Sequence, residues 1–209
     1  MALPWRDWTE WESIYAALFS LDNDEARSRG LMRVATWRTR GRVPLAVEMT
    51  ATFVELEMCD RARQTARSDG PSATAALSDH SISLTYAMAV TRLVNGVVDP
   101  MQQRVRATSV QKLAAEVQLP ASLVAARHEA THNRLPSLPT LRLASEQAML
   151  WLHERYWRYV YVYEYTYTYI YMYIYIYVYI HLCINIYMYI YMTLTPTRTL
   201  TLTRTLTLP

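Results

Sequence analysis

The side chains best suited to chemistry gather in one six-residue run, which reads Arg-His-Glu-Ala-Thr-His from Arg127 to His132. Because an α-helix advances about 100° per residue, His128 and His132 lie on nearly the same helical face. With Glu129 between them they form H-E-x-x-H, the zinc-peptidase signature. Arg127 and His132 also suit a phosphodiester, since a guanidinium binds phosphate oxygens and an imidazole transfers protons near neutral pH. The run alone is therefore compatible with a zinc site, with phosphodiester chemistry, or with an ordinary solvated helix face that has no chemical role.

A zinc peptidase needs a third protein ligand and an open position for water. After His132 the chain continues with Asn-Arg-Leu-Pro, which does not extend into the longer zinc motif of the metzincins. The proline also ends the helix. A third ligand would have to return from the following helix, where the candidates are Glu146, His153 and Glu154. The zinc peptidase therefore stays an alternative, and we expect no metal at this run.

The elements that position the run are predicted to be helices, because apolar residues recur at spacings of three or four. Prolines, Gly41 and short polar residues mark the helix boundaries. The first apolar stripe contains Trp5, Trp8 and Trp11, which we expect in the core and not on a base-stacking surface. An all-α bundle is the predicted fold, since no strand pattern occurs among these segments. We expect helices near residues 5–18, 24–40, 44–59, 79–98, 109–117, 120–132 and 138–157.

Composition divides the chain into a domain and a tail. Residues 1–157, rich in Ala, Leu, Val and Trp, are long enough to bury one core. Within that domain, residues 61–78 turn to Arg, Ser, Ala, Gly and Pro, which indicates a flexible insertion. Residues 158–209 form a low-complexity tail, which we expect to lack a compact fold.

The tail has tyrosine at every second position over residues 159–179 and threonine at every second position over residues 193–207. A period of two is typical of a strand. A strand from Tyr159 to Met192 would, however, be about 110 Å long, which no compact domain holds. Near-repeats of TA or TG encode these residues, so we infer a translated dinucleotide repeat that is disordered or artefactual. Its nearly uncharged, β-prone sequence is an aggregation hazard.

The overall charge leaves the partner undecided. A formal charge of +3 and an isoelectric point near 8.8 are too mildly basic to indicate nucleic acid by themselves. Cys59 and Cys183 lie far apart in sequence, which favours an intracellular protein over a disulfide-bonded secreted one. The start of the chain lacks the basic and apolar regions of a signal peptide. We expect no membrane segment, because no apolar run is long and uniform enough.

Four blocks of the sequence together span nearly all of residues 5–157. They are WRDWTEWESIYAALFS (Trp5 to Ser20), VATWRTRGRVPLAVEMTA (Val34 to Ala51), YAMAVTRLVNGVVDPMQQ (Tyr86 to Gln103) and LPASLVAARHEATHNRLPSLPTLRLASEQAMLWLHERYW (Leu119 to Trp157). In content and order they resemble the Las-one family of endoribonucleases, which process the second internal transcribed spacer of pre-ribosomal RNA. Four ordered blocks are more specific than a single motif.

The resemblance implies a HEPN-like helical bundle and metal-independent RNA cleavage, with no cofactor. Enzymes of that superfamily carry an Arg and a His separated by four residues, which match Arg127 and His132, and the family also has the His that matches His128. The implied reaction is attack of the ribose 2′-OH on the adjacent phosphorus, which leaves a 2′,3′-cyclic phosphate and a 5′-OH. We assign proton transfer to His132, charge stabilisation to Arg127, and a second acid–base or phosphate-binding role to His128.

The resemblance also implies partners and a location. Sites of this kind lie where two copies of the helix face each other, so a homodimer is expected, acting on pre-ribosomal RNA in the nucleus and nucleolus. Family members work with a polynucleotide 5′-kinase, which they engage through a C-terminal segment. Here repeats occupy that place, so we do not expect this chain to hold the kinase as they do. A catalytically silent helical scaffold is the remaining alternative to nuclease and peptidase.

Basic side chains are the candidates for contacts with the RNA backbone. Those at the end of the second predicted helix are also favoured there by the helix dipole, so ordinary capping explains them equally. The candidates are Arg33, Arg38, Arg40, Arg42 and Arg134.

Overall fold

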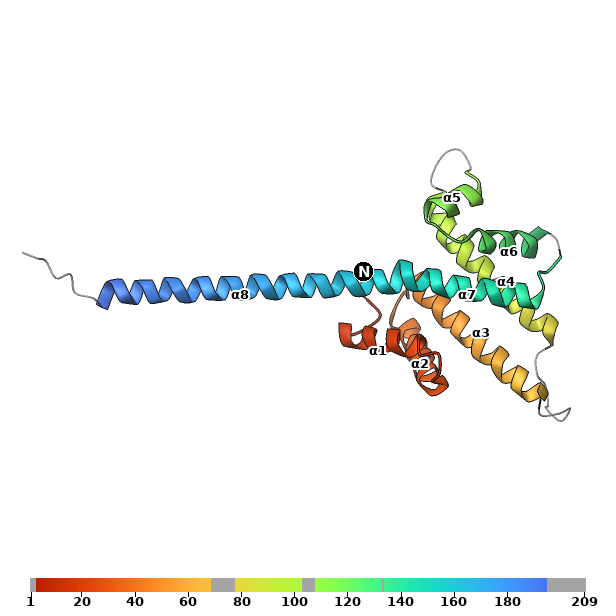
Figure 1. Ribbon diagram of the computed structural model, residues 1–209, viewed down its shortest axis with the longest axis horizontal. Coiled ribbons are helices and arrows are strands. Elements are labelled where there is room, and N and C mark those ends of the chain that lie inside the picture. The colour runs from red at the N-terminus through yellow and green to blue at the C-terminus, as the bar shows by residue number, and fades with distance from the viewer. Residues whose placement is uncertain (1–2, 69–77, 103–107, 133, 195–209) are drawn as a thin grey trace, which may run out of the picture. The chain divides into compact units, whose positions relative to one another are not determined.

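The computed structural model describes residues 3–68, 78–102, 108–132 and 134–194, and within these ranges it contains helices and no strand. The prediction of an all-α protein is therefore confirmed (Figure 1). The chain divides into two units, Met1–Tyr161 and Val162–Pro209, each of which is described by itself. The elements are α1 (Trp8–Leu18), α2 (Asp24–Arg40), α3 (Leu45–Ser68), α4 (Asp79–Val98), the 3-10 turn η1 (Asp99–Met101), α5 (Val110–Glu116), α6 (Ala121–His132), α7 (Leu138–Leu152), the π-helical turn η2 (His153–Trp157) and α8 (Arg158–Leu194).

Several helices begin where a short polar side chain accepts a hydrogen bond from the backbone N–H three residues further on, which satisfies one free donor of the first turn. For α4 this cap is Ser78, whose side chain accepts from the Ser81 backbone N–H. Pro44 and Pro120 lie directly before α3 and α6, where the missing proline N–H is not needed. The capping residues are Asp7, Asn23, Ser78, Ser109 and Ser137.

Helix α3 is longer than its sequence predicts. We expected it to end near Cys59 and a flexible insertion to follow over residues 61–78, but the helix continues through Ser68. That expectation is wrong for residues 61–68, and residues 69–77 lie outside the described residues. The added turns carry Arg63 and Arg67, which make ion pairs with a residue far along the chain.

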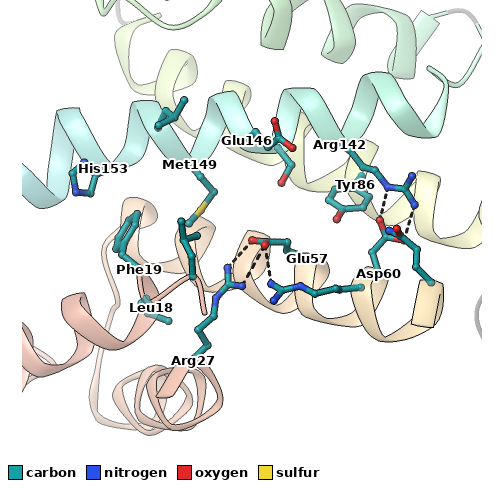
Figure 2. Close-up of a pocket in the computed structure, with 15 residues that line it drawn as sticks. Leu18, Phe19, Arg27, Glu57, Asp60, Tyr86, Arg142, Glu146, Met149 and His153 are labelled. Atoms are coloured by element: carbon teal, nitrogen blue, oxygen red, sulfur yellow. Dashed lines mark hydrogen bonds and ion pairs between the residues drawn. The ribbon is translucent and has the colours of Figure 1, made fainter. Parts of the chain in front are cut away.

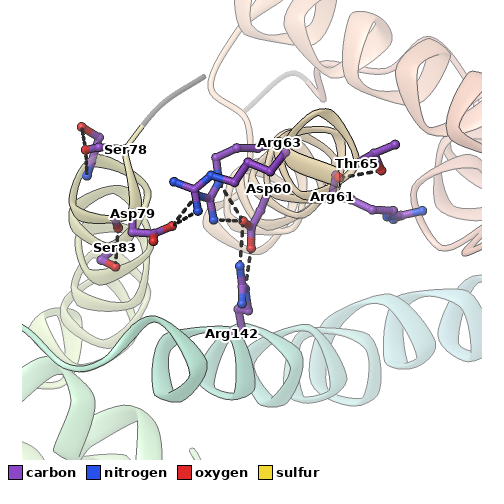
Figure 3. Close-up of polar contacts among 10 residues, drawn as sticks. Asp60, Arg61, Arg63, Thr65, Ser78, Asp79, Ser83 and Arg142 are labelled. Atoms are coloured by element: carbon purple, nitrogen blue, oxygen red, sulfur yellow. Dashed lines mark hydrogen bonds and ion pairs between the residues drawn. The ribbon is translucent and has the colours of Figure 1, made fainter. Parts of the chain in front are cut away.

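Arg63 also pairs with Asp60, a buried carboxylate on α3, within a larger ion-pair network (Figure 3). Arg142 on α7 donates from Nε to Asp60 Oδ2 at 2.6 Å and from Nη2 to Oδ1 at 3.0 Å. Arg63 donates from Nη2 to Asp60 Oδ1 at 2.8 Å and also donates to Asp79 at the start of α4. Arg67 donates to the same Asp79 at 2.8 Å. The network joins α3, α4 and α7, and it gives the buried charges the opposite partners that burial requires.

Two apolar clusters lie under the helices of the first unit. The larger is built by α3, α4, α5, α6 and α7, and it includes Leu93, Leu123 and Leu152. The smaller joins α1, α2 and α3, and it includes Trp37 and Trp157. Helix α6 packs against α4, α5 and α7, whereas α2 packs against α1 and α3. The candidate run on α6 therefore takes its position from the larger cluster.

Of the N-terminal tryptophans, Trp11 belongs to the core as predicted, whereas Trp5 and Trp8 are half-buried and pack against it. Trp11 is fully buried and stacks on Trp8, with ring centroids 4.4 Å apart. Trp157 meets Trp11 with centroids 5.0 Å apart and donates from its indole N–H to Thr50 Oγ1 at 2.9 Å. Trp5 packs against the same cluster. These rings close the smaller cluster, so they are not a surface on which bases stack.

The second unit departs from the pattern of its sequence. Through Leu194 the period-two sequence forms the helix α8, instead of the strand-like or disordered segment that the pattern indicated. Because a helix turns every 3.6 residues, alternating residues are spread over all of its sides and α8 has no polar face. None of the stretch from Tyr169 to Ile190 is buried. The translated-repeat origin of this sequence stays a prediction, and residues 195–209 lie outside the described residues.

Two stretches of the described chain are long and apolar enough to cross a membrane by length and composition, Asp79–Met101 and Tyr169–Ile190. Our expectation that no apolar run reaches this length is therefore wrong. The first stretch is half buried in the larger cluster, which accounts for its apolar character. The second has no Asp, Glu, Lys or Arg, and it is exposed, so it favours self-association of the full chain.

Residues 1–161 produced alone are expected to be soluble and helical, whereas the full chain is expected to aggregate. The first unit has its own core, and an exposed uncharged helix favours self-association. Circular dichroism and light scattering on both proteins measure this. A version that ends at Trp157 should melt at a lower temperature than 1–161, because it loses Tyr161, whose ring centroid lies 6.3 Å from that of Trp8. A soluble full chain beside an unfolded 1–161 would show that the tail belongs to the fold.

Candidate active site

Helix α6 carries the candidate run along the surface of the larger cluster. Leu123 is fully buried and Ala126 nearly so, and these residues define the face of α6 that packs inward. The run from Arg127 to His132 forms the last part of the helix, as the sequence predicted. Pro136 follows, and α7 begins at Leu138. The run therefore lies at the C-terminal end of a short helix whose other side is fixed in the core.

Arg127 lies at the edge of the inward face. Its side chain is half-buried, and its Nε donates to Asn95 Oδ1 on α4 at 3.1 Å. Within the described part of the chain, neither terminal nitrogen of the guanidinium has a hydrogen bond or an ion pair. Arg127 therefore keeps donors available for an anion.

The two histidines are turned away from the core. His128 and His132 are exposed, and their ring centroids are 5.0 Å apart. Neither imidazole makes a hydrogen bond or an ion pair with a residue that the structure describes. The structure thus brings Arg127, His128 and His132 together on one helix, with both imidazoles outside the fold.

The residues present do not fit a three-ligand zinc centre at the histidine pair. In the described ranges no group of three His, Cys, Asp or Glu side chains is placed to hold a metal ion. Of the candidate third ligands, His153 shares a hydrogen bond with the Tyr15 hydroxyl at 2.8 Å, and its Nδ1 lies 3.5 Å from Glu154 Oε1. Glu146 and His153 line a cavity that no residue of α6 lines. Glu129 is exposed, and among the residues that the structure describes none joins the histidine pair as a third metal ligand.

Glu10 forms ion pairs with two of the arginines that were expected to contact RNA. It is buried, and it accepts hydrogen bonds from the Arg6 backbone N–H at 2.7 Å and from Trp37 Nε1 at 3.2 Å. Arg40 and Arg33 lie 3.2 Å and 3.6 Å from its Oε1. Burial alone would raise the pKa of Glu10, but the hydrogen bonds from Arg6, Trp37 and Arg40 outweigh it and lower the pKa to about 2. Arg33 and Arg40 therefore already compensate an internal carboxylate.

The remaining candidate RNA contacts divide between two places. Arg38 donates from Nε and Nη2 to Glu48 Oε2 at 2.9 Å and 2.8 Å, while Arg42 is exposed just beyond α2. Arg134 is exposed directly after the candidate run. Arg134 thus lies two residues beyond the run in sequence, whereas the arginines of α2 lie on a helix that packs into the other cluster. An RNA contact by any of them stays a prediction.

A cavity of about 690 Å³ lies between α1, α2, α3, α4 and α7 (Figure 2). Leu18, Phe19 and Met149 supply apolar wall. Arg27, which is fully buried, donates to both carboxylate oxygens of Glu57 at 2.6 Å and 3.3 Å. No residue of the candidate run lines this cavity, so it is separate from the candidate site. No pattern in the sequence predicts this cavity, because its walls come from segments far apart in the chain.

Asn95 is the site residue that sequence reasoning missed. It is a single amide in the last, largely apolar turn of α4, between Val94 and Gly96. A polar residue among buried valines is the local signal that could have drawn notice. Its partner lies 32 residues further along the chain, however, so only the fold shows what it binds.

Acid is expected to destabilise the first unit between about pH 4.5 and pH 2. Burial would raise the pKa of Asp60, but the hydrogen bonds from Arg142 and Arg63 outweigh it and lower the pKa to about 2, as happens for Glu10. Such a carboxylate contributes stability above its unfolded pKa, 3.8 for Asp60 and 4.5 for Glu10, and loses it as the pH falls through the folded value. The contribution is at most about 2.5 kcal/mol for Asp60 and about 3.5 kcal/mol for Glu10.

Urea unfolding of residues 1–161 across this pH range measures the acid effect. The variant Asp60→Asn should be less stable at neutral pH and should lose less stability on acidification, because it has one titrating group fewer. Equal acid slopes in the two proteins would contradict the role given to Asp60.

The fold and the site define an all-α domain with an arginine and two histidines on the exposed end of one helix, a set of groups suited to phosphodiester chemistry. A model of the Las1-like family matches residues 3–159. The chain belongs to this family, which confirms the resemblance to the Las-one family.

Three relatives match this chain over part of their own length. It is 36% identical over 129 residues to the pre-rRNA-processing protein las1 of Schizosaccharomyces pombe, covering 62% of this chain and 24% of the relative. It is 34% identical over 165 residues to protein LAS1 of Saccharomyces cerevisiae, covering 74% and 31%. It is 28% identical over 159 residues to the ribosomal biogenesis protein LAS1L of Mus musculus, covering 75% and 19%. The chain spans less than a third of the length of each relative.

Proposed function

We propose that this chain is an endoribonuclease that cleaves the second internal transcribed spacer of pre-ribosomal RNA without a metal ion, during ribosome biogenesis. The observation that carries the proposal is the placement of Arg127, His128 and His132 together at the exposed end of α6. Family membership supports the substrate, since two of the relatives are named as a pre-rRNA-processing protein and a ribosomal biogenesis protein. The nucleus, and the nucleolus within it, is the location that this substrate requires.

In the proposed reaction the ribose 2′-OH attacks the adjacent phosphorus, and the bond from phosphorus to the 5′ oxygen of the next nucleotide breaks. A base takes the 2′-OH proton and an acid protonates the leaving oxygen, so the products carry a 2′,3′-cyclic phosphate and a 5′-OH. His132 transfers a proton, and His128 is the second acid–base or phosphate-binding group. Arg127 directs its terminal N–H groups to the phosphate oxygens as negative charge builds on them.

The active form is proposed to be a homodimer in which two α6 helices face each other. His128 and His132 point away from the core of their own subunit, and no described residue covers them. A second copy related by a two-fold axis would place its own histidines opposite, which encloses the phosphate between two subunits. Light scattering on residues 1–161 should therefore give twice the mass of one chain.

The same proposal requires contacts with the RNA backbone and yields a product with a 5′-OH. Arg134 is the first candidate to hold the RNA backbone, because it is exposed directly beyond His132. A second set of RNA contacts is assigned to Arg33, Arg38, Arg40 and Arg42. Three of these arginines already pair with Glu10 or Glu48, which weakens their attraction for RNA. The 5′-OH product is the substrate of a polynucleotide 5′-kinase, and the expectation that this chain does not hold the kinase as other family members do stays a prediction.

The test is cleavage of a structured spacer RNA in the presence of EDTA. Residues 1–161 should cut it and leave 5′-OH ends, because neither the nucleophile nor the charge stabilisation needs a metal. Glu129→Gln is the matched control at the same run, since a zinc peptidase would lose its general base with this change. A metal-independent nuclease should keep most of its activity after the Glu129→Gln change.

Two outcomes would overturn the proposal. Loss of activity in EDTA or in a well-folded Glu129→Gln dimer would favour the zinc enzyme. A folded wild-type dimer that cuts no RNA under any of these conditions would favour a silent helical scaffold.

A further inference from the structure

The guanidinium of Arg127 is held at one end only. Its Nε donates to Asn95 Oδ1 at 3.1 Å, while Nη1 and Nη2 have no hydrogen bond or ion pair with any described residue. Because arginine has donors and no acceptor, the Asn95 oxygen, and not its NH₂ group, must face Nε. The contact therefore fixes which edge of the guanidinium faces the protein and which edge faces outward.

The helices that carry Asn95 and Arg127 are both held in place by packing. On α4, Val94 and Val98 on either side of Asn95 are buried in the larger cluster. The next residue, Gly96, lies so close to Leu45 of α3 that an added Cβ would come within 2.7 Å of the leucine side chain. On α6, the residue before Arg127 is the buried Ala126. The hydrogen bond thus joins two helices that packing already holds in place.

We propose that Asn95 is a positioning residue for Arg127 in the RNA cleavage proposed above. By occupying Nε, it leaves Nη1 and Nη2 as a pair of parallel donors aimed away from α4, which suits two oxygens of one phosphate. It also restricts the rotation of a long side chain that would otherwise lose conformational entropy on binding. Asn95 does not touch the substrate, so its effect passes through Arg127 alone.

The experiment is a double-mutant cycle in the full 209-residue chain, carried on a solubility fusion partner. Asn95→Leu removes the acceptor at nearly constant volume, and kcat should fall by about 10- to 100-fold with KM within about twofold, because a misplaced catalytic group costs rate on this scale. Arg127→Lys keeps a positive charge but has no Nε–H for Asn95 to hold. In the Arg127→Lys background, Asn95→Leu should therefore change kcat by less than about threefold.

Thr91→Ala is the matched control, since Thr91 is half-buried one turn earlier on α4, and it should leave kcat unchanged. Single-turnover assays keep the slow variants measurable. Wild-type kcat in a folded Asn95→Leu protein, or an equal loss from Asn95→Leu in both backgrounds, would overturn the role of Asn95 while leaving the nuclease proposal intact. Wild-type protein that does not cleave RNA in EDTA would instead remove the nuclease proposal on which this inference rests.

Discussion

His132→Ala is expected to lower the rate of RNA cleavage by about 10²–10⁴-fold, the range for loss of a general acid–base group. The His132 ring is exposed, and within the described chain it meets the His128 ring but makes no hydrogen bond or ion pair, so its removal should leave the fold and the melting temperature unchanged. Arg127→Ala is expected to be severely impaired as well, but its folding needs checking, because this variant also loses the hydrogen bond to Asn95. Single-turnover cleavage of labelled RNA in EDTA gives the rates.

The matched control for this prediction is His80→Ala. His80 is also an exposed histidine on a helix, at the start of α4, so a general effect of removing an imidazole would appear there too. Full cleavage by a folded His132→Ala dimer would remove His132 from the mechanism and would leave His128 as the remaining acid–base candidate.

Asp60→Ala is expected to destabilise the first unit by about 3–5 kcal/mol, as is usual when one partner of a buried ion pair is removed. The Arg63 side chain is only 4% exposed, and without Asp60 its guanidinium would keep a single exposed partner, Asp79. Arg142 would also lose both of its hydrogen bonds. Urea unfolding followed by circular dichroism measures the change in the free energy of unfolding.

The exposed pair between Glu25 and Arg29, at 2.6 Å on α2, provides the control. Glu25→Ala should cost less than about 0.5–1 kcal/mol, because solvent screens the pair. A similar small loss for Asp60→Ala would mean that the network in Figure 3 contributes little to stability. Below its melting temperature Asp60→Ala should cleave RNA normally, since the network does not include α6.

Local sequence signals predicted most helices of the first unit. Helix α2 begins after Asn23 and ends before Gly41, as expected, because both boundaries depend on residues adjacent to the helix. The end of α3 could not be predicted in this way. Its last turns carry arginines whose partner, Asp79, comes from α4, and no pattern in residues 61–68 reveals that partner. The helical state of the tail was missed because the strand that a period of two indicates is too long for a compact domain, and the segment was therefore expected to be disordered or artefactual.

The candidate site was predictable in its chemistry and not in its surroundings. Spacing alone places His128 and His132 on one side of a helix, and the structure agrees. That both rings point away from the core follows from the burial of Leu123, which depends on tertiary packing. The partners of the basic cluster on α2 were likewise hidden, because Glu10 lies on a different helix.

The outward direction of the His128 and His132 side chains has a genetic consequence under the proposed two-subunit mechanism. If intact and defective copies pair at random, a cell that makes them in equal amounts holds only about a quarter of its pairs with both subunits intact. A His132→Ala allele that folds normally would therefore be dominant-negative, whereas an Asp60→Ala allele that fails to fold would be recessive. Inheritance of the two alleles would then distinguish a defect of chemistry from a defect of folding without purifying either protein.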